Sequence, residues 1–214
     1  MTINVLTLFP EIFNTYIQTS IIGRAVKNSL VEINIYNLRD FGVGDRKSVD
    51  GKPYGGGGGM VLRVDVVDRA IKKIRSDDPK TETILLCPKG DTYTQNTATN
   101  LSQKPSITLI CGHYQGFDYR IYEIVDQVIS IGDYITTGGE TAALSMLDSV
   151  TRLLPDVLNP DSLIDETFQG NLTETPLYTE PSDFGGQKVP EILLSGHHKA
   201  IGEYRQKNRK KIPL

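Results

Sequence analysis

Short apolar runs alternate with amphipathic segments along the first 154 residues of the chain. The runs with the length and composition of strands cover residues 3–9, 31–36, 83–87, 106–111 and 127–131. Helices are predicted at residues 10–17, 20–28, 94–101, 118–126 and 140–154. One more helix is predicted with Asp65 as its cap, because the apolar residues that follow have helical spacing: Val66, Val67, Ala70, Ile71 and Ile74. Strands that alternate with helices predict an α/β fold, in which a parallel sheet carries helices on both faces.

Two glycine-bearing segments, residues 111–116 and 130–140, each follow an apolar run and precede a helical pattern. In an open α/β sheet, such loops meet at the carboxyl ends of the strands, where ligands bind. Glycine lets a ligand approach the main chain closely, so backbone groups can hold a flat cofactor there. Together with Pro88, these segments predict a nucleotide-like site late in the sheet.

The pattern changes after Pro155. Residues 156–183 contain seven acidic residues and no Lys or Arg, which indicates a linker. A small helical segment is expected from residue 189 to about residue 211. The predicted domains are therefore residues 1–154, an acidic linker at 155–183, and a short helical domain at 184–214.

Composition narrows the function classes. The formal charge of −3 excludes a globally basic nucleic-acid binder, although it allows a local basic patch. No apolar stretch approaches the ~20 residues that span a bilayer, and we expect the first residues to form a strand instead of a signal peptide. Cys87 and Cys111 each end an apolar run, so we expect both to be buried, reduced thiols of a cytoplasmic protein. No His or Cys cluster has the spacing of metal ligands, so no metal site is assigned.

The glycine run at residues 54–60, Tyr-Gly-Gly-Gly-Gly-Gly-Met, is not a Walker motif, because no Gly-Lys-Ser/Thr follows it. On composition alone it is a flexible linker. Because large side chains frame it, it can instead lie flat against a base or cofactor. The first strand is not followed by the G-x-G-x-x-G turn of dinucleotide-binding folds, which disfavours Rossmann-type methyltransferases and dehydrogenases.

These residues carry a resemblance. The chain resembles the bacterial tRNA (guanine-N1)-methyltransferases of the SPOUT superfamily, which modify guanosine 37, next to the anticodon. The matching stretches are residues 8–10, 23–28, 39–41, 49–50, 54–60, 111–116, 130–140, 148–150, 152 and 194–196, in family order. The resemblance implies a C-terminal trefoil knot in the sheet domain and a homodimer whose active sites are shared between subunits. It also implies tRNA binding by residues 184–214.

The resemblance also implies site residues. S-adenosylmethionine would be the methyl donor, and the sequence does not indicate whether Mg²⁺ takes part. The implied donor-binding residues are Leu85, Leu86, Pro88, Gly112, Tyr114, Gln115, Gly116, Ile131, Gly132, Tyr134, Ile135, Gly138 and Gly139. The implied substrate-binding residues are Tyr54, Gly57, Gly58, Gly59, Arg24, Lys199 and Arg205. Gln115 stands where many relatives carry glutamate, so a charge or metal role does not transfer to that side chain.

Methylation of guanine N1 requires a base that removes the N1 proton and a cation near O6. Arg152 matches the arginine of the family. The carboxylate is either Glu166 or Asp165, because the linker is one residue shorter than in close relatives. Without the resemblance, Arg152 is a solvated residue at a helix end, and both carboxylates belong to an exposed linker.

A local basic patch is present near the C-terminus. After His198 come six basic residues against one acidic residue, a local charge of about +5. This charge is either a solvated helix end or a contact for tRNA phosphates. Two alternative functions stay open: a ribose 2′-O-methyltransferase of the same fold, and an inactive homologue that only binds tRNA.

Overall fold

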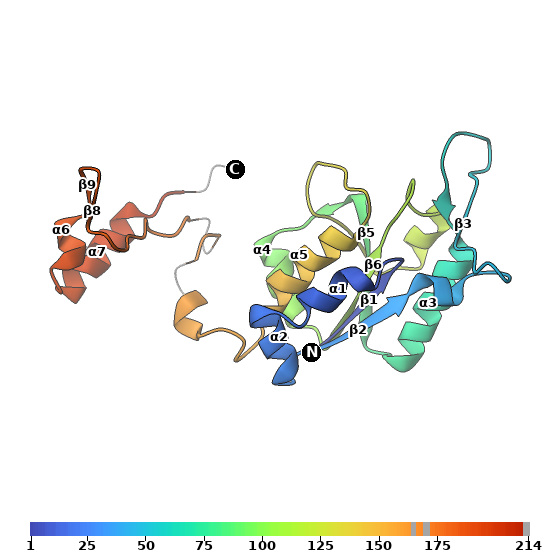
Figure 1. Cartoon of the computed structure of the whole chain (residues 1–214), viewed down its shortest axis with the longest axis horizontal. Coiled ribbons are helices and arrows are strands. Elements are labelled where there is room, and N and C mark those ends of the chain that lie inside the picture. Colours follow the sequence, from blue (N-terminus) through green and yellow to red (C-terminus); the bar gives the residue numbers. More distant parts are fainter. Residues whose placement is uncertain (164–165, 169–171, 212–214) are drawn as a thin grey trace. The chain divides into compact units, whose positions relative to one another are not determined.

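The structure is a computed structural model that describes residues 1–163, 166–168 and 172–211 (Figure 1). The chain divides into two compact units, Met1–Leu158 and Asn159–Leu214. Among the described residues, no helix has the length and apolar content needed to cross a bilayer.

The first unit is built on a five-stranded sheet in the order β2-β1-β6-β5-β7, with all neighbours parallel. The strands are β1 (Thr2–Thr7), β2 (Glu32–Asn37), β5 (Thr81–Thr92), β6 (Ser106–Cys111) and β7 (Gln127–Ser130). Each covers one of the predicted apolar runs. The predicted parallel sheet is therefore confirmed.

Helices cover both faces of this sheet, as predicted (Figure 1). Successive strand residues point to opposite faces, so Leu86 and Ile129 join one apolar cluster while Leu85 and Ile110 join the other. The helices on the first face are α1 (Glu11–Tyr16), α2 (Ser20–Lys27), α4 (Gln95–Ser102) and α5 (Glu140–Thr151), and the helix on the second is α3 (Val64–Asp77).

Strand β5 is longer than the run at residues 83–87 predicted. It continues past Pro88, and Asp91 and Thr92 pair with β7 after a shift in register. A β-carbon on Gly90 would lie 2.5 Å from the carbonyl carbon and oxygen of Val128, so glycine is required where the two backbones approach. The predicted strand ended too early because the sequence Pro-Lys-Gly at residues 88–90 is typical of a turn.

Two local predictions were wrong. The expected helix at residues 118–126 is a 3₁₀ turn, η2 (Tyr119–Glu123), where the side chain of Asp118 accepts from the N–H of Arg120. Asp65 does not cap α3, because Arg63 occupies the N-cap position and binds both carboxylate oxygens of Asp65 at 2.9 Å. The hydrogen bonds from Arg63 hold the pKa of Asp65 below its ordinary value.

The predicted loop at residues 39–59 contains short elements. A 3₁₀ turn, η1 (Leu38–Phe41), packs on α3, and β3 (Asp50–Gly51) pairs antiparallel with β4 (Val61–Leu62). The glycine run connects β3 to β4 and forms the extended loop above β3 in Figure 1.

The second unit contains a 3₁₀ turn η3 (Pro160–Leu163), the hairpin β8 (Asp183–Phe184) and β9 (Gln187–Lys188), and the helices α6 (Glu191–Leu194) and α7 (His198–Asn208). Its chain is tied to α7 by the Thr175 hydroxyl, which donates to the carbonyl of Arg205 at 2.9 Å. Just past α7, the N–H of Thr173 donates to the carbonyl of Lys210 at 2.8 Å. The division into a linker and a helical domain stays a prediction.

Asp126 joins three elements of the first unit. Its Oδ2 accepts from the N–H of Thr83 at 2.8 Å, from the Thr83 hydroxyl at 2.7 Å and from the Arg75 guanidinium at 2.9 Å. Burial raises the pKa of Asp126, but the hydrogen bonds from Thr83 and the charge of Arg75 outweigh it, so the pKa lies below its ordinary value. The carboxylate thus holds β5, the start of β7 and α3 together.

We predict that Asp126→Asn lowers the free energy of unfolding at pH 7 by about 1 kcal/mol, because a partly exposed charged contact is lost. In the wild type, this contribution is present above the unfolded pKa of about 3.9 and is lost as pH falls through the lower folded pKa. The variant therefore shows a smaller loss of stability upon acidification, measured by urea unfolding between pH 7 and pH 3. Asp40→Asn is the control, since the exposed pair of Asp40 with Lys47 joins no strands. Equal pH profiles for the wild type and Asp126→Asn would contradict the prediction.

Candidate active site

A cavity of about 750 Å³ lies at the carboxyl ends of three neighbouring strands. Its wall consists of residues 86–89 of β5, residues 112–117 after β6, and residues at the end of β7 and in the following loop up to Gly139. This is the sheet edge at which α/β proteins bind ligands. The volume lies within the range of small-molecule sites, about 300–1,000 Å³.

The structure brings most of the implied donor-binding residues together here. Those that line the cavity are Leu86, Pro88, Gly112, Tyr114, Gln115, Gly116, Ile131, Tyr134, Ile135, Gly138 and Gly139. Leu85 and Gly132 are not among the lining residues. The Leu85 side chain is fully buried in the cluster that packs against α3, and the Tyr134 ring lies 2.6 Å from the position of a β-carbon on Gly132.

The segment before α5 lies directly against the loop after β6. The N–H of Gly139 donates to the carbonyl of Gly112 at 2.8 Å, and Gly138 forms an antiparallel bridge with His113. A β-carbon on Gly139 would lie 2.7 Å from the Gly112 nitrogen and 2.8 Å from the Cys111 α-carbon. Glycine is therefore required for this backbone approach.

The end of the glycine run is attached to the cavity loop. The N–H of Gln115 donates to the carbonyl of Met60 at 3.0 Å, and the N–H of Leu62 donates to the carbonyl of Gly116 at 2.9 Å. A β-carbon on Gly59 would meet the Gln115 side chain at 2.7 Å. The C-terminal end of the glycine run is thus fixed to the cavity loop by hydrogen bonds, whereas a simple linker would make no such contacts.

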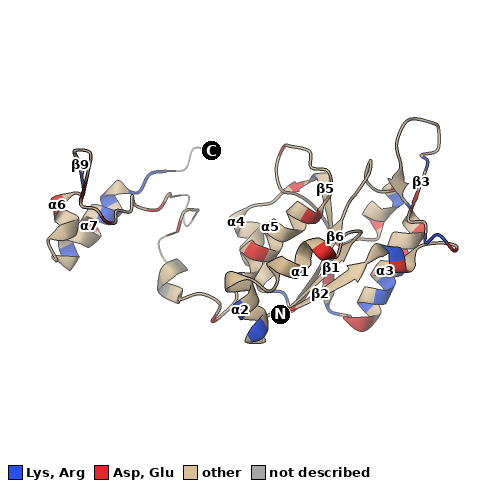
Figure 2. Ribbon diagram, in the orientation of Figure 1, with Lys and Arg blue, Asp and Glu red and all other residues tan. Residues whose placement is uncertain are grey.

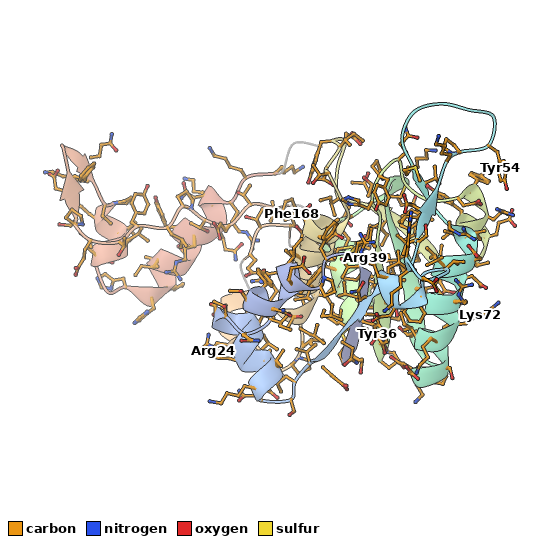
Figure 3. All side chains as sticks on the ribbon, turned by 45° about the vertical axis from the view of Figure 1, so that its right-hand side comes forward. Arg24, Tyr36, Arg39, Tyr54, Lys72 and Phe168 are labelled. Atoms are coloured by element: carbon orange, nitrogen blue, oxygen red, sulfur yellow. The ribbon has the colours of Figure 1, made fainter. Side chains whose placement is uncertain are left out.

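The rest of the run extends into solvent. Tyr54 is fully exposed, and Gly57 and Gly58 are exposed as well. Figure 3 shows Tyr54 on this loop at the edge of the molecule. These implied substrate-binding residues are accessible, and they do not line the cavity.

The sequence analysis missed an aromatic wall. Tyr119 and Tyr122 stack with ring centroids 5.3 Å apart, and both line the cavity. The Tyr122 hydroxyl is hydrogen-bonded to the Cys87 sulfur at 2.9 Å. Burial and this hydrogen bond raise the pKa of Tyr122, so its hydroxyl stays protonated at neutral pH. The spacing of three residues just after a glycine loop is the signal that would have found this pair.

Lys89 is a second residue that the sequence analysis missed. It lines the cavity from the extended part of β5, and it is exposed. Its ammonium group places a positive charge at the mouth of the cavity. The signal in the sequence is its position next to Pro88.

Arg152 lies away from the cavity in its own chain. It caps the C-terminus of α5, and its N–H donates to the carbonyl of Asp148 at 3.0 Å. Gly139 caps the opposite end of the same helix. At 1.5 Å per residue, the two caps are roughly 20 Å apart along the helix axis. Arg152 is half-buried and is not among the lining residues.

The other implied residues fall on several elements. Glu166 is half-buried in the second unit, and Asp165 lies outside the described residues. Lys199 and Arg205 are exposed on α7, which carries basic residues in Figure 2. Arg24 is exposed on α2 (Figure 3). Within the described part of the chain, no group of three or more His, Cys, Asp and Glu side chains is arranged to hold a metal ion.

The model of the family tRNA (Guanine-1)-methyltransferase TrmD matches residues 1–212. The chain belongs to this family. Two of the glycine segments that carried the resemblance, residues 111–116 and 130–140, contribute to the wall of the cavity.

Members of this family from several bacteria are similar to the chain over nearly its whole length. A tRNA (guanine-N(1)-)-methyltransferase of Malacoplasma penetrans (strain HF-2) is 48% identical, over 99% of this chain and 94% of the relative. One of Clostridioides difficile (strain 630) is also 48% identical, over the same shares. One of Mycoplasma pneumoniae is 46% identical, over 98% of this chain and 90% of the relative.

We predict that Gly139→Ala lowers the free energy of unfolding by about 1–3 kcal/mol, because its β-carbon overlaps backbone that has no free space. Gly51→Ala is the matched control. A β-carbon on Gly51 meets nothing within 4 Å, and its effect stays within about 0.5 kcal/mol. Urea unfolding of both variants measures the difference, and equal stabilities would refute the close approach of Gly139 to Gly112.

Proposed function

We propose that the protein transfers a methyl group from S-adenosylmethionine to N1 of guanosine 37 in tRNA. The observation that carries the proposal is the family match over residues 1–212, combined with a cavity formed by the glycine segments of that family. The relatives named above are tRNA (guanine-N(1)-)-methyltransferases by name. The proposed location is the cytoplasm.

The cavity suits the methyl donor. Its volume of about 750 Å³ accommodates a nucleoside with an amino-acid arm. The turns at Gly112 and Gly138 bring main-chain groups to the cavity, while Leu86 and Ile131 offer apolar contacts. When bound, S-adenosylmethionine supplies an activated methyl group on a positively charged sulfur. The residues of this chain orient that donor and exclude water from it.

The acceptor determines which further residues are needed. In neutral guanine, N1 carries a proton, so a carboxylate removes that proton as N1 attacks. We assign this step to Glu166 or Asp165. Negative charge then develops toward O6, where the guanidinium of Arg152 stabilises it.

We also propose that the active site is shared between the subunits of a homodimer. Arg152 and the cavity lie at opposite ends of α5, so the guanidinium of one chain is not at the cavity of that chain. A two-fold dimer brings the same surface of both chains together. In it, the Arg152 of each subunit would serve the cavity of the other.

A trefoil knot is part of the proposal. It is supported by the contact between the segment before α5 and the loop after β6, where Gly139 lies against Gly112 and Gly138 bridges His113. In a knot, the chain after β7 would pass through this loop before α5 begins. Nothing in the apolar pattern predicts such threading, which ordinary folds avoid.

The tRNA contacts are assigned to exposed groups. Lys199 and Arg205 on α7, in the proposed domain at residues 184–214, would bind phosphates, as would Arg24 on α2. The exposed glycine loop with Tyr54 would lie against the target nucleotide. Phosphate contacts position the RNA, and base contacts provide its specificity.

The decisive experiment is a methyl-transfer assay on unmodified tRNA with labelled S-adenosylmethionine. We expect label in tRNA that has guanosine at position 37, none when that base is replaced, and 1-methylguanosine after digestion. A 2′-O-methylated nucleoside would instead identify a ribose methyltransferase. Retention of tRNA on a filter without transfer of label would identify a binding homologue.

Shared sites make a further prediction about mixed dimers. Arg152→Ala and the cavity variant Gly112→Val each abolish activity alone. When the two are mixed and refolded together, half of the dimers contain one intact site, so activity returns to about a quarter of the wild-type value. Co-purification of an untagged variant with an affinity-tagged one measures subunit exchange. No recovery in the exchanged mixture would contradict the shared site.

A further inference from the structure

His113 carries a polar atom without a partner in the wall of the cavity. Its Nδ1 is one of three buried side-chain polar atoms of the described residues that make no hydrogen bond. A buried polar atom without a hydrogen bond lowers the stability of a protein by about 1–3 kcal/mol, so its presence in a native structure calls for an explanation. Because His113 lines the cavity, the unpaired nitrogen lies next to the proposed site.

Glu140 is a buried carboxylate close to His113. It is the first residue of α5 and only 6% exposed, although glutamate is almost never buried without partners. Its Oε1 accepts from the hydroxyl of Thr7 at 2.8 Å, and the same hydroxyl accepts from the N–H of Phe9 at 3.0 Å. The carboxylate is thus fixed to the end of β1, at a helix N-terminus that favours negative charge.

Gly138 lies between the two groups. A β-carbon on Gly138 would be 2.3 Å from Oε2 of Glu140 and 2.9 Å from Nδ1 of His113. The second carboxylate oxygen and the unpaired nitrogen therefore flank the same point, which only glycine leaves empty. The bridge between His113 and Gly138 holds the two backbones in register.

The imidazole ring is held in its plane by aromatic neighbours. Phe9 and Tyr114 meet it edge-on, with ring centroids 5.0 and 4.8 Å away. The carboxylate also affects the thiol of Cys111, because burial and then the negative charge of Glu140 raise the pKa of Cys111. The contacts at Gly138 thus place the Glu140 carboxylate close to His113.

We propose that Glu140 is a positioning residue that accepts the Nδ1–H of His113 after a small rotation of either side chain. A neutral imidazole has one N–H, so this bond leaves Nε2 unprotonated as an acceptor for the cavity. An acceptor there is complementary to the N–H donors of S-adenosylmethionine, its adenine amino group and its α-ammonium. The ligand part of the inference rests on the proposed function, whereas the tautomer does not.

Nitrogen-15 NMR of the imidazole rings tests the tautomer directly. The chain has three histidines, so His113→Gln identifies the signals of residue 113. At a pH where imidazole is neutral, we expect the Nδ1–H tautomer in the wild type. In Glu140→Leu, the population shifts to the Nε2–H tautomer that a free histidine favours. An Nε2–H tautomer in the wild type overturns the proposal without any Glu140 variant, so misfolding of that variant leaves the test intact.

Affinity for S-adenosylmethionine, measured by calorimetry, tests the consequence at the cavity. We expect Glu140→Leu to weaken binding about tenfold and to add little in a His113→Gln background, because it acts through His113. Glu82→Leu is the matched control, since Glu82 is a part-buried carboxylate paired with Lys104 outside the cavity. Equal losses in Glu140→Leu and Glu82→Leu, or full additivity with His113→Gln, overturn the positioning role. If the wild type does not bind S-adenosylmethionine, the proposed function fails while the NMR result stands.

Discussion

The hydrogen bond from the N–H of Gly139 to the carbonyl of Gly112 is the contact on which the cavity depends. It joins the segment that starts α5 to the loop that ends β6, two parts of the chain that the sheet alone does not connect. Because Gly139 has no side chain, the two backbones approach to a distance that a β-carbon at this position would prevent. The main chain at Gly139 therefore shapes part of the cavity wall, while side chains such as Tyr119 and Tyr122 complete it.

Much of the sheet was predictable because its central strands, β1 and β6, are buried on both faces. Parallel strands covered by helices give continuous apolar runs, and the run at residues 106–111 coincides with β6. Local signals failed where tertiary contacts decide the conformation. Residues 118–126 have helical spacing, yet the hydrogen bond at Asp118 and the packing of Ile121 against α3 stop the chain at a 3₁₀ turn.

The candidate site was predictable to the extent that it is made of glycine turns. Those turns follow apolar runs, and the carboxyl edge of a parallel sheet brings them together. Tyr119, Tyr122 and Lys89 were missed because they reach the cavity only through the η2 turn and the extension of β5. The proposed catalytic residues are a different case, since Arg152 lies at the far end of α5 from the cavity of its own chain. No local sequence pattern reveals which residue, from a distant part of the chain or from a neighbouring subunit, completes such a site.

The main-chain character of the cavity has a consequence for inhibition. A compound that occupies this space meets the peptide groups of turns whose glycines, such as Gly139, have no room for a side chain. A codon change elsewhere in the wall alters a side chain and leaves those peptide groups in place. An inhibitor built to bind the peptide groups would thus be less sensitive to single substitutions in the wall.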